Sequence, residues 1–158
     1  MASINQNSVP EKHRISPKGK YEIYRKQVSL AIGGIKDVGP WGGGHPFDIE
    51  LARIPCGKVG YPLHSHAAQT EYYIILQGAG ILRIEDRQAP VYAGDHFICL
   101  PGVTHQIINN SYEDLIYYVI ADHHRSDVTT YPESDKRQIK PEYRYFHISD
   151  VDYYDGEE

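Results

Sequence analysis

Short apolar or alternating runs, each closed by a turn signal, follow one another along most of the chain. They cover residues 47–54, 71–76, 81–85, 90–92, 96–100, 105–109 and 115–121. Glycine, proline, aspartate or asparagine lies between them, and no stretch has the period of an amphipathic helix of ordinary length. Many short strands at this spacing predict an all-β fold, either a sandwich or a barrel.

Two glycine-framed segments, residues 57–78 and 94–109, carry the side chains best suited to metal chemistry. They contain three histidines and one glutamate: His64, His66, Glu71 and His105. His64 and His66 are two residues apart, so their side chains point to the same face of a strand. Three imidazoles and one carboxylate suit one divalent transition metal, namely Mn, Fe, Ni, Co or Zn. Gln69 is a weaker competitor for the fourth position, because it carries no charge.

The same two segments resemble the two sequence motifs of the cupin superfamily. The first motif, Gly-x5-His-x-His-x(3,4)-Glu-x6-Gly, matches from His64 to Gly78, whereas Gly57 lies one residue too far from His64. The second, Gly-x5-Pro-x-Gly-x2-His-x3-Asn, matches except that its proline is displaced to Pro101. The chain is similar to single-domain (cupin-2 type) metal-binding cupins, some of them provisionally named sugar-phosphate isomerases. The resemblance implies a double-stranded β-helix, or jelly-roll, barrel.

Length and charge indicate one small domain that binds neither nucleic acid nor a membrane. The 158 residues can bury one core, and the net charge of −5 gives no reason to bind nucleic acid or an anionic membrane. The start of the chain lacks an apolar signal segment, and there are only two cysteines, so we expect a cytoplasmic protein. We expect an N-terminal arm over 1–20, a cupin barrel over 21–125, and a tail over 126–158 that packs on or beside it.

Strand alternation extends the site to further residues. If Glu71 points inward, Tyr73 does too, and Tyr61 lies three residues before His64; either tyrosine is a candidate for moving a proton in catalysis. Along residues 47–53 the apolar positions share a face with Arg53. If that face lines the barrel, Arg53 is a candidate substrate-binding residue for a carboxylate or phosphate; the alternative is a surface ion pair.

Three functions fit such a site. A divalent ion acting as a Lewis acid would serve an isomerase, epimerase or lyase on a sugar phosphate or hydroxy acid, and we favour this hypothesis. An Fe- or Mn-dependent dioxygenase or decarboxylase is an alternative. Oxalate-decarboxylase-like cupins tend to carry arginine where this chain has Tyr61, which weakens that resemblance. A non-catalytic cupin that binds a small ligand is the third. The resemblance also implies a homodimer, which outward-facing tyrosines would suit.

Overall fold

The computed structural model describes residues 3–158, and almost all of its regular structure is β. The strands are β1 (Lys12–Ile15), β2 (Glu22–Gln27), β3 (Phe47–Ile54), β4 (Ser65–His66), β5 (Glu71–Gln77), β6 (Ala79–Ile84), β7 (Arg87–Tyr92), β8 (His96–Cys99), β9 (His105–Ile108), β10 (Leu115–Asp122), β11 (Asp127–Tyr131), β12 (Lys136–Lys140) and β13 (Arg144–Phe146). The short helices are α1 (Val28–Ala31) and the 3-10 turns η1 (Gln6–Ser8), η2 (Pro40–Gly42) and η3 (Pro132–Ser134). The predicted all-β class is confirmed.

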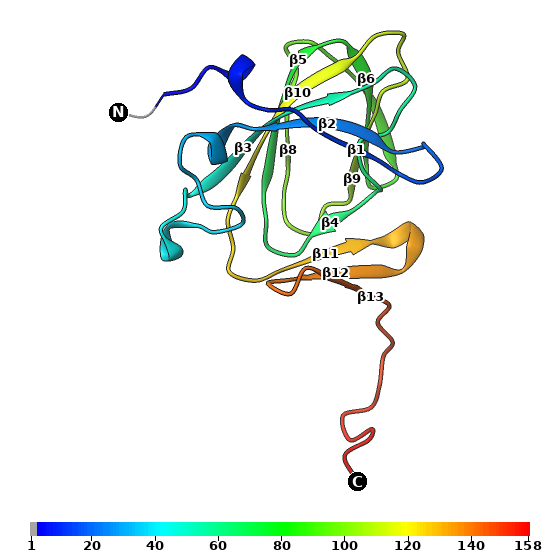
Figure 1. Ribbon diagram of the computed structural model, residues 1–158. Helices are drawn as coiled ribbons and strands as arrows, with labels where there is room; N and C mark the ends of the chain where they lie inside the picture. The colour runs from blue at the N-terminus through cyan, green and yellow to red at the C-terminus, as the bar shows by residue number, and fades with distance from the viewer. Residues whose placement is uncertain (1–2) are drawn as a thin grey trace.

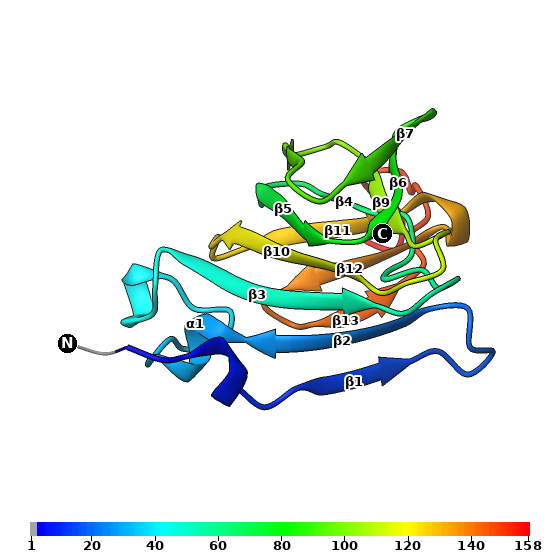
Figure 2. The same ribbon diagram turned by 90° about the horizontal axis from the view of Figure 1, so that it is seen from above.

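The strands form three antiparallel sheets. A six-stranded sheet has the order β1-β2-β3-β10-β5-β8, and a three-stranded sheet has the order β7-β6-β9. These two sheets curve into the barrel in Figure 1, and Figure 2 shows from above how β1, β2, β3 and β10 lie side by side in the six-stranded sheet. The third sheet, β13-β12-β11-β4, lies below the barrel in Figure 1 and is joined to it through β4.

The core lies between the inner faces of the two barrel sheets. Its cluster of buried side chains is Ile23, Ala52, Ile54, Tyr73, Ile75, Leu82, Val91, Cys99, Ile107, Leu115 and Tyr117. Along β5 the alternation follows the prediction, since Tyr73 and Ile75 are buried whereas Tyr72 and Leu76 are exposed. Tyr73 therefore shares the inner face of the barrel with the core, as expected from the position of Glu71.

The predicted orientation of β3 is wrong by one residue. Ala52 and Ile54 are buried and face the interior, so the face shared by Leu51 and the other odd-numbered residues points outward. The N-terminal segment lies near part of that outer face, since the backbone carbonyl of Gln6 accepts a hydrogen bond from the side chain of Lys26, which pairs with Leu51 in the sheet. Phe47, at the start of the strand, stays exposed on this face, so apolar character does not mark the interior side of β3.

Two residues of the glycine-framed segments hold turns. Gly78 has a φ of +81°, and a Cβ there would lie 2.4 Å from the backbone oxygen of Asp114, so only glycine fits without strain. Asn109 is fully buried, and its amide nitrogen donates to the backbone oxygens of Ile54 and Glu113 at 2.8 and 2.7 Å. Asn109 thus ties the loop before β10 to the end of β3.

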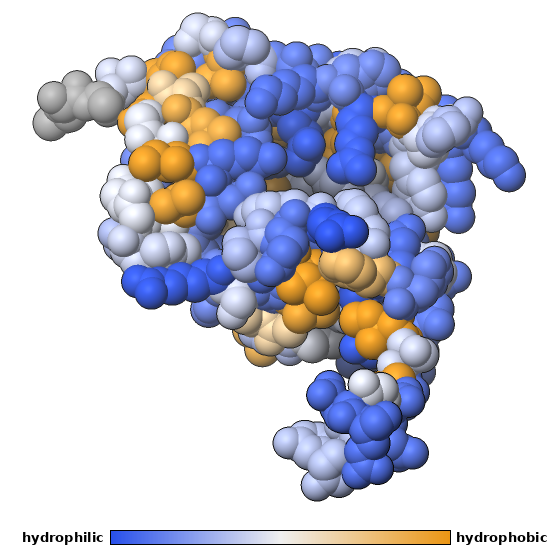
Figure 3. Space-filling view, turned by 60° about the horizontal axis from the view of Figure 1, so that its bottom comes forward, coloured by the Kyte–Doolittle hydropathy of each residue, from blue (hydrophilic) through white to orange (hydrophobic). Residues whose placement is uncertain are grey.

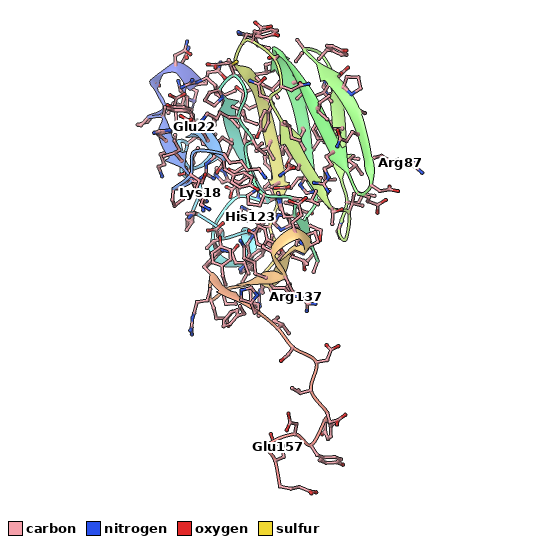
Figure 4. All side chains as sticks on the ribbon, turned by 90° about the vertical axis from the view of Figure 1, so that its right-hand side faces the viewer. Lys18, Glu22, Arg87, His123, Arg137 and Glu157 are labelled. Atoms are coloured by element: carbon pink, nitrogen blue, oxygen red, sulfur yellow. The ribbon has the colours of Figure 1, made fainter. Side chains whose placement is uncertain are left out.

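The two ends of the chain differ in how they meet the barrel. Residues 12–15 pair with β2 as the edge strand β1. Residues 127–146 form β11, β12 and β13, and the segment beyond them leads away from the barrel, with Glu157 near its far end (Figure 4). The division of the chain at residues 20 and 125 stays a prediction. No helix in residues 3–158 has the length and apolarity needed to cross a membrane.

Candidate metal centre

The histidines and the glutamate of the two glycine-framed segments meet at one end of the barrel. His64 forms a bridge with His105, the first residue of β9, through backbone hydrogen bonds of 3.2 and 2.8 Å. His66 belongs to β4, and Glu71 is the first residue of β5. Potential ligand atoms of His64, His66 and Glu71 all lie within 4.8 Å of one another, which makes these three a candidate metal site.

His105 lies beside this triad. Its Nε2 is 2.8 Å from Glu71 Oε2, and its ring centre is 4.5 Å from that of His64. The close cluster of potential ligands contains the triad without His105, so its assignment as the fourth ligand stays a prediction.

Each of the three imidazoles is oriented by a hydrogen bond at its Nδ1 atom. His64 Nδ1 donates to the carbonyl of Pro62 at 2.9 Å, and His105 Nδ1 donates to that of Val103 at 3.1 Å. His66 Nδ1 donates to the carboxylate of Asp127 at 2.6 Å. Because carbonyls and carboxylates only accept, Nδ1 of each ring carries a proton, and Nε2 keeps its lone pair whenever the ring is neutral. Metal-binding histidines have this arrangement, so the donor set fits a divalent ion.

Burial and charge set the protonation of the cluster. Burial lowers the pKa of His64 to about 4, so this ring is neutral at pH 7. Burial alone would raise the pKa of Glu71, but the hydrogen bond from His105 and the neighbouring imidazoles lower it to about 2. Burial would lower the pKa of His105, but interactions with Cys99 and Glu71 raise it to about 10. Without a metal, Glu71 and His105 therefore form a buried ion pair, and a bound cation would replace the proton.

Comparison with known proteins agrees with this geometry. The cupin domain family matches residues 50–121, which include all four side chains. This part of the chain is therefore a cupin domain. The chain aligns with a crystal structure named "putative sugar phosphate isomerase" from Acidithiobacillus ferrooxidans, with a TM-score of 0.76, 23% identity and 92% of each chain covered.

Two further solved structures share the cupin fold. A sugar phosphate isomerase from Silicibacter pomeroyi aligns with a TM-score of 0.74 and 18% identity over 91% of this chain and 90% of its own. A "predicted oxalate decarboxylase" from Thermotoga maritima aligns with a TM-score of 0.63 and 20% identity over 77% and 99%. No curated protein matches the sequence significantly. At these identities the likeness confirms the predicted cupin fold, a double-stranded β-helix.

The triad faces a cavity of about 640 Å³. Its walls come from the inner faces of β1, β2, β3, β5 and β10, and the strands β11, β12 and β13 also contribute. Tyr131 of β11 reaches the triad, with its ring roughly parallel to that of His64 at a centre-to-centre distance of 6.0 Å. The cavity is large enough for a small ligand that also contacts the triad.

Both tyrosines chosen from the sequence line this cavity. The Tyr73 hydroxyl donates to Glu71 Oε2 at 2.9 Å, and burial raises its pKa well above the usual range. The Tyr61 ring lies 6.2 Å from that of His64, and burial also raises its pKa. Both hydroxyls are therefore protonated at neutral pH and serve as hydrogen-bond donors.

Arg53 does not line the cavity, so its predicted place is wrong. It lies on the outer face of β3, where its guanidinium contacts Glu11 at 2.9 Å and Asp114 at 3.0 Å. It also covers the ring of Tyr24 at 3.9 Å. The error follows from the inverted face of β3, and the structure matches the alternative of a surface ion pair.

Sequence reasoning missed two residues that bear on the site. Asp127 is 61 positions from His66, and its role depends on the pairing of β11 with β4, which no spacing rule predicts. Arg25, on β2, lines the cavity, as does Arg14 on β1. Gln69, the weaker candidate ligand, is buried and donates to the backbone oxygen of Asp122 at 2.7 Å.

Proposed function

We propose that this cupin is a metal-dependent enzyme in which a divalent ion acts as a Lewis acid. The reaction class is isomerisation, epimerisation or elimination on a small sugar phosphate or hydroxy acid. The observation that supports this most is the triad His64, His66 and Glu71, with free imidazole Nε2 atoms, facing a cavity that holds a small substrate. We assign His105 as the fourth ligand because its Nε2 already contacts Glu71. Two structural neighbours bear sugar phosphate isomerase names, which agrees with the proposal.

The bound ion would polarise substrate oxygens and stabilise negative charge that develops on them. Tyr73 would complement it, since its hydroxyl is held by Glu71 Oε2 and stays protonated. When Glu71 turns toward a metal, that hydroxyl can donate to a substrate oxygen instead. Its raised pKa makes this hydroxyl a weak acid that stays protonated, which suits hydrogen-bond donation to negative charge on the substrate rather than removal of a proton. Tyr61, on the other side of His64, would orient the substrate by the same kind of donation.

An oxygen-dependent decarboxylase or dioxygenase is the principal alternative, because the same ligands suit Fe(II) or Mn(II). The two functions differ in their need for oxygen. The test begins with metal analysis of protein purified without added metal. Sugar phosphates and hydroxy acids are then screened by NMR in D₂O under argon, with Mn(II) or Zn(II) supplied. Deuterium incorporation or conversion without oxygen supports the proposal, whereas turnover only with oxygen uptake refutes it. Stoichiometric ligand binding without conversion would indicate a non-catalytic cupin.

We also propose a homodimer that forms through the outer face of β5 and β8. Tyr72, Leu76 and Ile98 are 38%, 42% and 48% exposed there. By contrast, the face in Figure 3 carries its apolar atoms in small patches separated by hydrophilic side chains. Light scattering of the native protein, compared with Ile98→Lys, tests this proposal: the native protein should have twice the monomer mass and the variant should dissociate.

A further inference from the structure

Arg25 lines the cavity, and the protein does not satisfy all of its hydrogen-bond donors. In the sheet it pairs with Ala52, which is buried, so the two side chains share the inner face. Its Nε atom is buried and has no hydrogen-bond partner within residues 3–158. Leaving a buried donor of a charged group unpaired is costly, which suggests that a ligand supplies the missing acceptor.

The contact of Arg25 with Glu50 is long, and the side chain of Tyr61 is the other group that interacts with its guanidinium. Nη1 lies 3.4 Å from Glu50 Oε2, whereas charge-assisted hydrogen bonds of this kind are typically about 2.7–2.9 Å. Glu50 also accepts from Gln27 through its other oxygen, at 3.2 Å. Arg53, on the opposite face of the same sheet, is held by two carboxylates at 2.9 and 3.0 Å. Arg25, which faces the cavity, therefore has a free hydrogen-bond donor, whereas Arg53 on the outer face is held by two close carboxylates.

The cavity is rich in other cationic groups. Arg14, Lys136 and Lys140 also line it, and none of these three forms an ion pair with any residue that the structure describes. Arg14 pairs with Ile23 in the sheet, so it lies on the same inner face as Arg25. Four carboxylates, those of Asp37, Asp48, Glu50 and Glu71, line the cavity as well, but none of them forms an ion pair with Arg14, Lys136 or Lys140. These three unpaired cations can attract an anionic ligand.

Tyr61 connects this cationic side of the cavity with the metal centre. The Arg25 guanidinium lies 5.8 Å from the centre of the Tyr61 ring, and that ring lies 6.2 Å from the ring of His64. A small molecule that lies along Tyr61 can therefore place an anionic group near Arg25 and metal-binding oxygens near His64.

We propose that Arg25, with Arg14 beside it on the same sheet face, forms a subsite for a carboxylate or phosphate group of the ligand. The planar guanidinium fork can donate two parallel hydrogen bonds to either anion, and its Nε–H is one of the free donors. Arg14 adds a second positive charge. The inference rests on the proposed function only for the part of the ligand that binds the metal. The anion subsite itself can be tested without any metal.

The experiment uses the full-length protein after removal of metal with a chelator, and inorganic phosphate or acetate as the probe. The ¹⁵N–¹H signal of Arg25 Nε, assigned by its loss in Arg25→Gln, is followed during titration. We expect a saturable downfield shift in the native protein and about 10- to 100-fold weaker binding in Arg25→Gln, as measured by ³¹P or ¹³C line broadening of the probes. Stronger binding of phosphate or of acetate tells which anionic group the ligand carries.

Arg53→Gln is the matched control, because it removes a guanidinium from the outer face of the same sheet. It should bind both probes as the native protein does, and thermal melting should show that all variants are folded. Equal affinity of native protein and Arg25→Gln would overturn the subsite, and so would an equal loss in Arg53→Gln or no shift with either probe. Metal content and turnover are measured separately. Their absence would refute the proposed function while leaving a positive anion result intact.

Discussion

The hydrogen bond between His66 and Asp127 allows a sharp prediction about metal affinity. Asp127 has a fully buried side chain, and its two oxygens accept from His66 Nδ1 at 2.6 Å and from the Ala68 backbone N–H at 2.8 Å. Asparagine has nearly the same shape but only one acceptor oxygen, so Asp127→Asn must lose one of the two contacts. If the amide NH₂ faces His66, the ring proton moves to Nε2, the atom that the metal requires.

The expected loss follows from this change of tautomer. Removing the partner that orients a metal-binding histidine typically weakens metal binding by about 10- to 100-fold, or roughly 1.4–2.7 kcal/mol. Thr129 Oγ1 lies 3.3 Å from His66 Nδ1 and accepts less strongly, so it offsets only part of the loss. Competition with a chelating dye, with Zn(II) as the metal, measures the affinity.

Asp95→Asn is the control for Asp127→Asn. Asp95 also uses a carboxylate oxygen to accept a backbone N–H, that of Tyr92 at 2.8 Å, but it is exposed and lies in the turn before β8. This variant should bind Zn(II) as tightly as the native protein. Unchanged affinity in Asp127→Asn, with its fold intact by circular dichroism, would contradict the placement of His66 in the metal site.

Three further predictions concern pH, backbone strain and catalysis. The raised pKa of His105 and the lowered pKa of Glu71 mean that a metal must displace a proton, so metal affinity should fall about tenfold per pH unit from about pH 8 to 6. Calorimetry in buffers of different ionisation heat should show about one proton released per ion, and a metal affinity that does not change with pH would contradict the ion pair of Glu71 and His105. Gly78→Ala should lower the free energy of unfolding in urea by about 2–4 kcal/mol, against about 1–2 kcal/mol for Gly94→Ala, where φ is similar but the space around the Cβ is open. Equal losses would refute the clash of a Cβ with the backbone of Asp114. Tyr73→Phe should lower kcat more than metal affinity. Lost metal with unchanged kcat in the loaded enzyme would argue against hydrogen-bond donation from the Tyr73 hydroxyl to the substrate.

The two glycine-framed segments predicted the fold and the meeting of the triad correctly, because both depend on local rules. A two-residue spacing on a strand and glycines at positive φ are visible in the chain itself, as for His64, His66 and Gly78. The alternation rule worked on β5, whose inner face is apolar beyond Glu71. It failed on β3 because the cavity side carries Glu50, and the usual link between apolar character and the interior is reversed there.

The missed residues share one physical cause. Arg25 and Asp127 both owe their place to pairing between strands distant in sequence, β2 with β3 and β11 with β4, and neither belongs to a local motif. Each is also a charged group in a partly closed interior, which is tolerated only when a partner compensates it. For Asp127 that partner is His66, at 2.6 Å. For Arg25 the residues described supply a carboxylate at 3.4 Å and the side chain of Tyr61 but no acceptor for Nε, which is why we propose an anionic group of the ligand as its partner. The same principle of charge compensation thus explains why Asp127 lies beside His66 and why we propose an anionic ligand group beside Arg25.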